Sequence, residues 1–170
     1  MSDEYQYYTS TQFLGKHGVT LKCMQAMVAI LAGPYHPEKI TMVIGSFDAS
    51  GSKRVMFLVW EWGYPGITIV SDGFGTHGGE GGAGLATVLG LIKYYQIPLL
   101  EVWIQDQKSF DELAHGTLTE DMFDEVQEGQ QPYNWKFYAP AKIQKVQKGE
   151  QQTLIAVRGD GHVIFNVNLP

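Results

Sequence analysis

The most informative part of the sequence runs from residue 67 to residue 104 and reads ITIVSDGFGTHGGEGGAGLATVLGLIKYYQIPLLEVWI. It opens with a short apolar run, Ile67 to Ser71, which is typical of a strand inside a sheet. A glycine-rich segment from Asp72 to Gly84 follows, and then apolar residues at helical spacing up to about Tyr95. Ile97-Pro98 starts a further strand that reaches Ile104. This order predicts a right-handed crossover between parallel neighbouring strands, with the glycine segment at the carboxyl end of the first.

The N-terminal side of this unit predicts one helix and one hairpin. Residues Thr20 to about Leu31 have helical spacing of apolar residues, with Thr20 as the cap and Gly33-Pro34 as the end. Ile40 to Phe47 and Arg54 to Trp62 read as two strands joined by a turn-rich connection, which is typical of a β-hairpin.

The C-terminal side predicts two short helices and then strands. Asp106 to about Gln127 reads as helical with a break near Gly116, and Thr119 supplies half of a capping box with Met122. Alternating apolar and polar residues beyond that point predict an antiparallel meander, or an extension of the first sheet, over four segments: Tyr133–Tyr138, Ile143–Gln147, Thr153–Arg158 and His162–Val167.

The fold class expected from these elements is α/β in the mixed α+β sense. A single domain over residues 1–170 would hold a mixed sheet flanked by helices, with residues 1–18 as a flexible N-terminal segment.

Composition limits the functional classes. Apolar residues make up 44% of the chain, enough for a substantial core, and no apolar run approaches the roughly 20 residues that span a bilayer. The single cysteine, Cys23, and the absence of a signal sequence favour the cytoplasm. The net charge of −6 argues against broad nucleic-acid binding and against docking on anionic membranes.

Charge is unevenly distributed along the chain. Residues 101–128 are rich in acids, and lysines and Arg158 predominate from Lys136 onward. The two regions are either separate solvated faces or surfaces that attract one another, and a homodimer is compatible with the second case.

The glycine segment is the leading candidate site. Backbone amides at the start of the following helix, together with its dipole, could hold a phosphate or carboxylate. The segment matches neither a P-loop nor a complete dinucleotide fingerprint, and the acids Asp72 and Glu80 bracket it. The residues expected to bind the ligand are Gly73, Gly75, Thr76, His77, Gly78, Gly79 and Glu80.

The strand, the Gly-Phe-Gly-Thr sequence of residues 73–76, the helix and the Ile-Pro-Leu-Leu strand resemble the nucleotide-monophosphate-binding segment of the lysine-decarboxylase-like family that releases cytokinins. That family has a glutamate three residues after the threonine, whereas here Gly79 takes that position and Glu80 follows it. The resemblance implies a nucleotide-like ligand.

Two other interpretations of the segment remain open. Its glycines could serve close packing or mobility at the surface, without any ligand. Alternatively, the loop is catalytic, with His77 as general acid or base and Glu80 or Asp72 orienting it.

Other residues offer weaker signals. The five histidines have no metal-ligand spacing, so no metal site is expected, and no cofactor can be named. His17 and His162 are expected in exposed loops, and Cys23 is expected to be buried and inert. Trp60 and Trp62 could stack on a ring, although core burial is the stronger expectation.

The sequence therefore predicts a small-molecule binding protein for an anionic, nucleotide-like metabolite held at residues 72–84. One alternative is an interaction or inhibitor protein that uses acidic helices over residues 106–128. A second is an enzyme acting on a nucleotide or sugar through His77.

Overall fold

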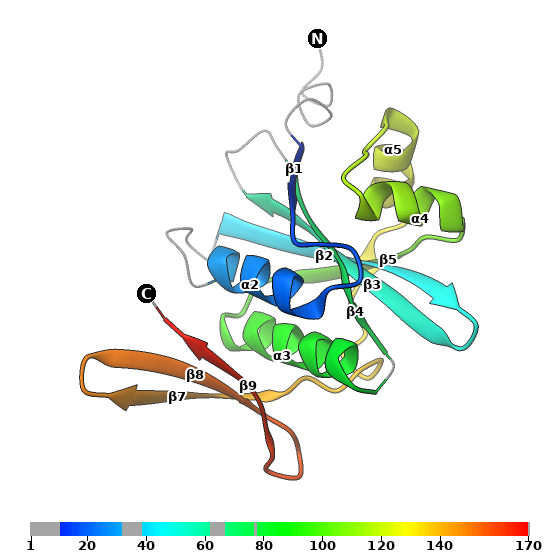
Figure 1. The fold of residues 1–170 in the computed structure, drawn as a ribbon. Coiled ribbons are helices and arrows are strands. Elements are labelled where there is room, and N and C mark those ends of the chain that lie inside the picture. The colour runs from blue at the N-terminus through cyan, green and yellow to red at the C-terminus, as the bar shows by residue number, and fades with distance from the viewer. Residues whose placement is uncertain (1–10, 32–38, 62–66, 77, 170) are drawn as a thin grey trace.

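The computed structural model describes residues 11–31, 39–61, 67–76 and 78–169. It has the predicted mixed α+β fold, in which helices flank a six-stranded mixed sheet and a separate three-stranded antiparallel sheet lies beside it (Figure 1). Within the described residues, none of the helices combines the length and apolar character needed to cross a membrane.

The six-stranded sheet has the order β1-β4-β3-β2-β5-β6. Its strands are β1 (Thr11–Leu14), β2 (Ile40–Ala49), β3 (Ser52–Glu61), β4 (Ile67–Gly75), β5 (Leu99–Trp103) and β6 (Gln131–Pro132). Strand β1 lies within the segment predicted to be flexible, yet it pairs in parallel with β4 from Thr11↔Ile67 to Leu14↔Val70. Residues 1–10 of that segment are outside the described residues.

The predicted hairpin is confirmed by the antiparallel pairing of β2 with β3. Ser50 and Gly51 connect the two strands with φ of 54° and 90°, the left-handed conformation that a tight hairpin turn requires. The predicted neighbour relation of the crossover strands is wrong: β4 and β5 point the same way, but β3 and β2 lie between them. The hairpin lies next to β4 because only residues 62–66 separate β3 from β4, whereas helix α3 separates β4 from β5.

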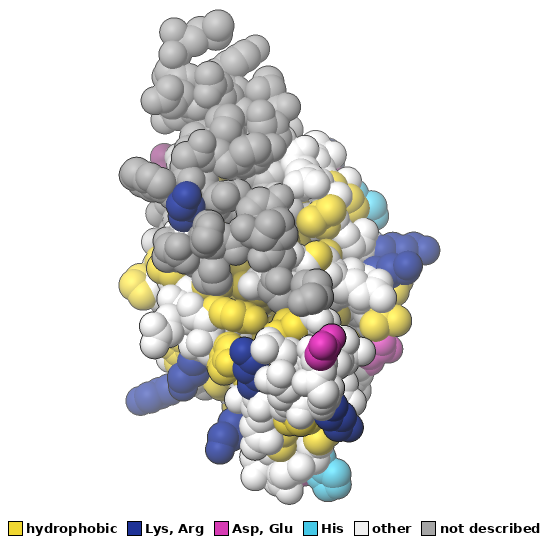
Figure 2. Space-filling view, turned by 90° about the vertical axis from the view of Figure 1, so that its left-hand side faces the viewer, with side chains coloured by type: hydrophobic (Ala, Val, Ile, Leu, Met, Phe, Trp, Pro, Cys, Tyr) yellow, Lys and Arg dark blue, Asp and Glu magenta, His cyan; other side chains and the backbone are white. Residues whose placement is uncertain are grey.

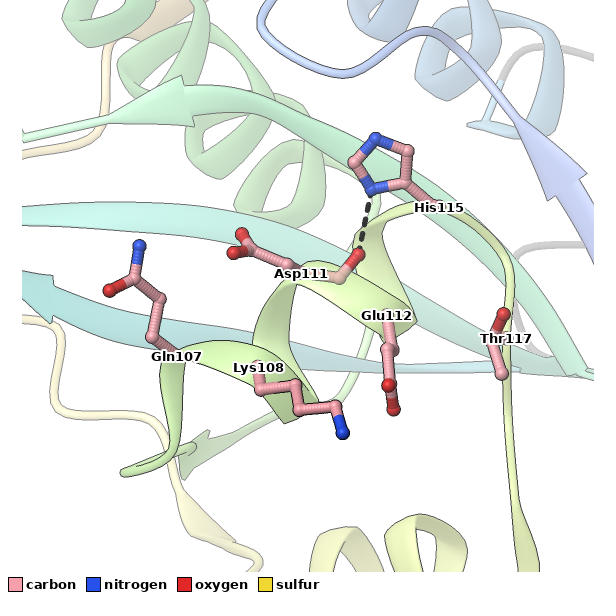
Figure 3. A pocket seen from close by; sticks show the side chains of 6 residues that line it. All are labelled: Gln107, Lys108, Asp111, Glu112, His115 and Thr117. Atoms are coloured by element: carbon pink, nitrogen blue, oxygen red, sulfur yellow. Dashed lines mark hydrogen bonds between the residues drawn. The ribbon is translucent and has the colours of Figure 1, made fainter.

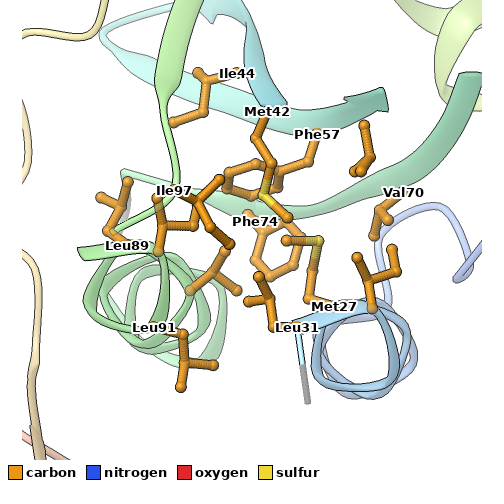
Figure 4. Close-up of a cluster of buried hydrophobic side chains, with 14 of the residues drawn as sticks. Met27, Leu31, Met42, Ile44, Phe57, Val70, Phe74, Leu89, Leu91 and Ile97 are labelled. Atoms are coloured by element: carbon orange, nitrogen blue, oxygen red, sulfur yellow. The ribbon is translucent and has the colours of Figure 1, made fainter. Parts of the chain in front are cut away.

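Successive residues of each strand point to opposite faces of the sheet, and helices bury both faces. Met42, Ile44 and Phe57 pack on one side with helices α2 (Thr20–Leu31) and α3 (Glu80–Tyr94), as Figure 4 shows. Val43 and Leu58 pack on the other side with α4 (Gln107–Ala114) and α5 (Glu120–Glu128). The helices on opposite faces explain why the strands read as nearly continuous apolar runs.

The boundaries of α2, α4 and α5 agree closely with the predicted ones, whereas α3 begins at Glu80, inside the segment predicted to be a loop. Helix α2 covers the predicted range, and the break near Gly116 separates α4 from α5. Thr119 is the N-cap of α5, and its hydroxyl accepts a hydrogen bond from the Met122 amide at 3.3 Å, as predicted. The capping role predicted for Thr20 is wrong: this residue lies inside α2, and its hydroxyl donates to the Gly73 carbonyl at 2.6 Å.

The C-terminal meander is confirmed as the separate sheet β7-β8-β9. Its strands are β7 (Lys142–Lys148), β8 (Gln151–Val157) and β9 (Val163–Asn168). Leu154 and Val167 from this sheet join the core around α3. The strand predicted over Tyr133–Tyr138 is absent, because these residues form turns whose aromatic rings pack on one another.

The glycine-rich segment is mostly regular structure. Residues 72–75 extend β4, residues 80–84 form the first turns of α3, and the connection between them is residues 76–79. A Cβ at Gly73 would lie 2.7 Å from Cys23 Sγ and 2.8 Å from the Val19 carbonyl oxygen, and one at Gly84 would lie 2.5 Å from Thr20 Cγ2. These glycines allow α2, α3 and β4 to approach one another closely.

We expect Gly73→Ala to lower the free energy of unfolding by about 1–3 kcal/mol, because backbone atoms around the new methyl cannot move away. Urea unfolding followed by circular dichroism measures the change. Gly78→Ala is the matched control, since a Cβ there meets nothing within 4 Å. Equal stability of the two variants would contradict the packing role of Gly73.

Glu101 on β5 is buried, and desolvation raises the pKa of its carboxyl above the ordinary value. A carboxyl whose pKa is raised by folding stabilises the protein when protonated, and this contribution is lost as pH rises through the folded-state pKa. We therefore expect Glu101→Gln to be more stable than the wild type at pH 7, with the difference shrinking at pH values below the ordinary pKa of glutamate. Thermal unfolding across this pH range measures the difference, and a difference that does not change with pH would refute the desolvation argument.

Candidate functional site

Helix α3 begins without a side-chain cap. Its N-cap, Gly79, has φ of 81° and makes no side-chain hydrogen bond to the helix. The first intrahelical bond found there runs from the Ala83 amide to the Gly79 carbonyl at 3.0 Å. The amides of the first turn before Ala83 therefore have no acceptor within the helix.

A cleft of about 330 Å³ runs along this end of the helix. We call it the α3 cleft. It lies between Gly78, Gly82 and Ala86 on one side and, on the other, the segment before β7 together with the turn between β8 and β9. Its lining residues from that second side are Tyr138, Ala139, Pro140, Ala141, Arg158 and Gly159.

Arg158 gives the cleft a fixed positive charge. Its side chain is exposed, and it directly follows β8, in the turn that leads to β9. The sheet beside it carries Lys142, Lys145 and Lys148. Figure 2 shows Lys and Arg side chains spread over the part of the surface that this sheet forms. An anion in the cleft would meet both a guanidinium and the start of a helix.

The structure separates the predicted binding residues into two groups. Gly78 lines the α3 cleft, and Gly79 and Glu80 begin the adjoining helix. Gly73 is buried in β4, and the Thr76 amide already donates to the Lys53 carbonyl at 3.1 Å. Gly75 also lies in β4, and His77 is outside the described residues.

Asp72 lies away from the α3 cleft, in a second cluster. Its side chain is 1% exposed, and Arg54 donates to Oδ2 through Nη2 at 2.6 Å and through Nε at 3.0 Å. His17 Nδ1 lies 2.6 Å from Oδ1. Arg54 also pairs with Asp111 of α4 at 2.9 Å. Because both oxygens of Asp72 already have partners, the structure provides no support for Asp72 as the residue that orients His77.

A second histidine completes this group, which we call the Asp72 cluster: His17, Arg54, Asp72, Asp111 and His115. The rings of His17 and His115 have centroids 4.9 Å apart. His115 is the C-cap of α4, and its Nδ1 lies 2.7 Å from the Asp111 carbonyl oxygen (Figure 3). The cluster joins the loop before α2, strands β3 and β4, and α4.

A hollow beside this cluster lies on α4. It measures about 600 Å³ and is lined by Gln107, Lys108, Asp111, Glu112, His115 and Thr117, as Figure 3 shows. Its lining carries one base, Lys108, and two acids, Asp111 and Glu112, which suits a polar ligand better than an apolar one.

Helix α5 presents its acidic residues to solvent. Helix α5 buries Met122, Phe123 and Val126, and it exposes Glu120, Asp121, Asp124, Glu125 and Glu128. Contact of this helix with a basic partner stays a prediction.

Cys23 has no role in either site. Its side chain is fully buried, and this burial raises the pKa of the thiol, so a reactive thiolate is disfavoured as predicted.

The sequence did not identify His17, Arg54 and His115 as a group. His17 lies between two glycines and was expected to be an exposed loop residue, whereas its partners, Asp72 and His115, come from β4 and the end of α4. The single sequence signal was Asp72, an acid that directly follows a buried strand. An acid in that position needs partners, but the sequence does not say which ones.

We expect Arg54→Met to lower the free energy of unfolding by about 2–4 kcal/mol, because the buried Asp72 carboxylate loses its charged partner. Lys53→Met is the matched control at the neighbouring position, where the partner Asp48 is 58% exposed; such a surface pair is worth about 0–1 kcal/mol. Urea unfolding of both variants measures the difference. Similar losses in the two would show that Asp72 does not need Arg54.

Comparisons with known proteins bear on the fold alone. No protein-family model and no curated protein sequence matches the chain, so the resemblance of the glycine segment receives no support from them. Among solved structures, the fold is similar to that of a chain of respiratory complex I from Thermus thermophilus, with a TM-score of 0.60 and 16% sequence identity. The match covers 75% of this chain and 98% of that chain, and it indicates a shared architecture.

Proposed function

We propose that this protein binds a small anionic metabolite of the phosphate-ester class, such as a nucleotide, in the α3 cleft, and that it does so in the cytoplasm. The observation that carries the proposal is the uncapped start of α3 beside a cleft that also contains Arg158. Free helix amides and a guanidinium are both donors that suit phosphate oxygens.

The size of the cleft suits a small ligand. A volume of about 330 Å³ lies at the lower end of the range typical of small-molecule sites. Tyr138 and Pro140 supply apolar surface on which the uncharged part of the ligand would rest, while Gly78 leaves the backbone accessible.

One charge opposes this role. Glu80 is the first residue of α3, and its exposed carboxylate occupies the same end of the helix dipole that would attract the ligand. Glu80 and Arg158 should therefore affect anion binding in opposite directions.

We expect a nucleoside monophosphate or sugar phosphate to raise the melting temperature of the wild-type chain, since it binds the native state alone. Arg158→Gln should weaken binding by about 10- to 100-fold, the equivalent of one charge-assisted hydrogen bond, and Glu80→Gln should strengthen it. Thermal shift with a panel of phosphate esters, followed by calorimetry of the best one, measures both effects.

Lys148→Gln is the control for the loss of one positive charge, because Lys148 lies at the end of β7 and does not line the cleft. The proposal fails if no phosphate ester raises the melting temperature, or if Arg158→Gln and Lys148→Gln weaken binding equally.

A further inference from the structure

We propose that His17 and His115 form a binding site for a divalent transition-metal ion of the zinc class. The site belongs to the Asp72 cluster and is separate from the α3 cleft, so it does not depend on the proposed function. Three features of the two histidines carry the inference.

The first feature is the hydrogen bonding of each ring. The Asp111 carbonyl oxygen can only accept, so the His115 nitrogen beside it, Nδ1, carries the proton. In the same way, His17 Nδ1 donates to the Asp72 carboxylate. In both rings the other nitrogen, Nε2, is then the atom that could bind a metal. Histidines that bind metals generally donate their other ring N–H to a carboxylate or a backbone carbonyl, and this pair shows one of each.

The second feature is the distance between the rings. Two imidazoles that share one tetrahedral ion through Nε2, each at about 2.0–2.1 Å, have ring centroids about 5 Å apart. The centroids of His17 and His115 are 4.9 Å apart, with the planes tilted by 36°. The distance between the centroids is therefore the one that joint coordination requires.

The third feature is the electrostatic surrounding. His115 closes the C-terminus of α4, where the helix dipole favours a positive charge. The cluster holds two carboxylates, Asp72 and Asp111, and one guanidinium, Arg54, and the hollow beside His115 adds one base, Lys108, and one acid, Glu112. A divalent cation would compensate the excess of negative charge.

Glycines with positive φ flank both histidines. His17 lies between Gly15 and Gly18, with φ of 81° and 70°, and the Asp72 carboxylate holds its ring. Gly116, with φ of 91°, follows His115, and a Cβ there would lie 3.1 Å from the Phe13 side chain. The segment around β1 and the end of α4 are thus in contact, which holds the two rings near each other.

The site offers two protein ligands and open positions for solvent. Among the described residues, no three His, Cys, Asp or Glu side chains are grouped to hold one ion. Water or a small ligand would fill the remaining positions, as in sites with exchangeable coordination rather than in closed structural zinc sites. Imidazole ligands suit zinc, copper and nickel.

The test is calorimetric titration of the untagged, full-length chain with zinc chloride, supported by the visible absorption of cobalt(II) as a report of its coordination. We expect one ion bound per chain, and at least tenfold weaker binding in His115→Gln. Asp72→Asn should weaken binding by about 10- to 100-fold, the usual effect of removing the partner of a metal-ligating histidine.

His162→Gln is the matched control, because His162 is also exposed and also paired with an aspartate, Asp160, at 3.0 Å. The His115 side chain is exposed, and its ring hydrogen-bonds to the backbone carbonyl of Asp111. We therefore expect His115→Gln to fold, and circular dichroism checks this before the titration. The proposal is overturned if the wild type binds no zinc at millimolar concentration, or if His115→Gln binds zinc as tightly as His162→Gln does.

Discussion

The buried carboxylate of Asp72 is the constraint on which the arrangement around β4 depends. A carboxyl group with 1% exposure must be surrounded by hydrogen-bond donors, and Arg54 and His17 provide them. Meeting this requirement ties β3 and the loop before α2 to the end of β4, and Arg54 extends the connection to α4 through Asp111. One charge therefore links segments from both faces of the sheet.

The second constraint is the close approach of α2 to β4 at Gly73. The Thr20 hydroxyl reaches the Gly73 carbonyl, and Cys23 lies where a side chain on Gly73 would have to be. The glycines that suggested a ligand-binding loop thus serve two purposes. Those within β4 and α3 allow packing against α2, whereas Gly78 and Gly79 leave the start of α3 open toward a cleft. This division keeps the packing function apart from the proposed binding function.

The two candidate sites differ in chemistry because they lie beside parts of the chain that carry opposite charges. The α3 cleft lies beside the basic three-stranded sheet, and its donors suit an anion. The Asp72 cluster adjoins the acidic helices, and its two neighbouring imidazole rings suit a cation. The acidic and basic regions of the sequence therefore lie beside different candidate sites.

The sequence by itself determined the elements whose signals are local: α2, the β2–β3 hairpin, the break between α4 and α5, the Thr119 cap and the C-terminal meander. These depend on periodicity, turn residues and caps within a few positions of one another. Tertiary structure decided the strand order, the partners of Thr20 and the use of Gly73 in packing. It also brought His17, Asp72 and His115 together, because contacts between residues so far apart in the chain follow from how layers pack, and no local pattern records that packing.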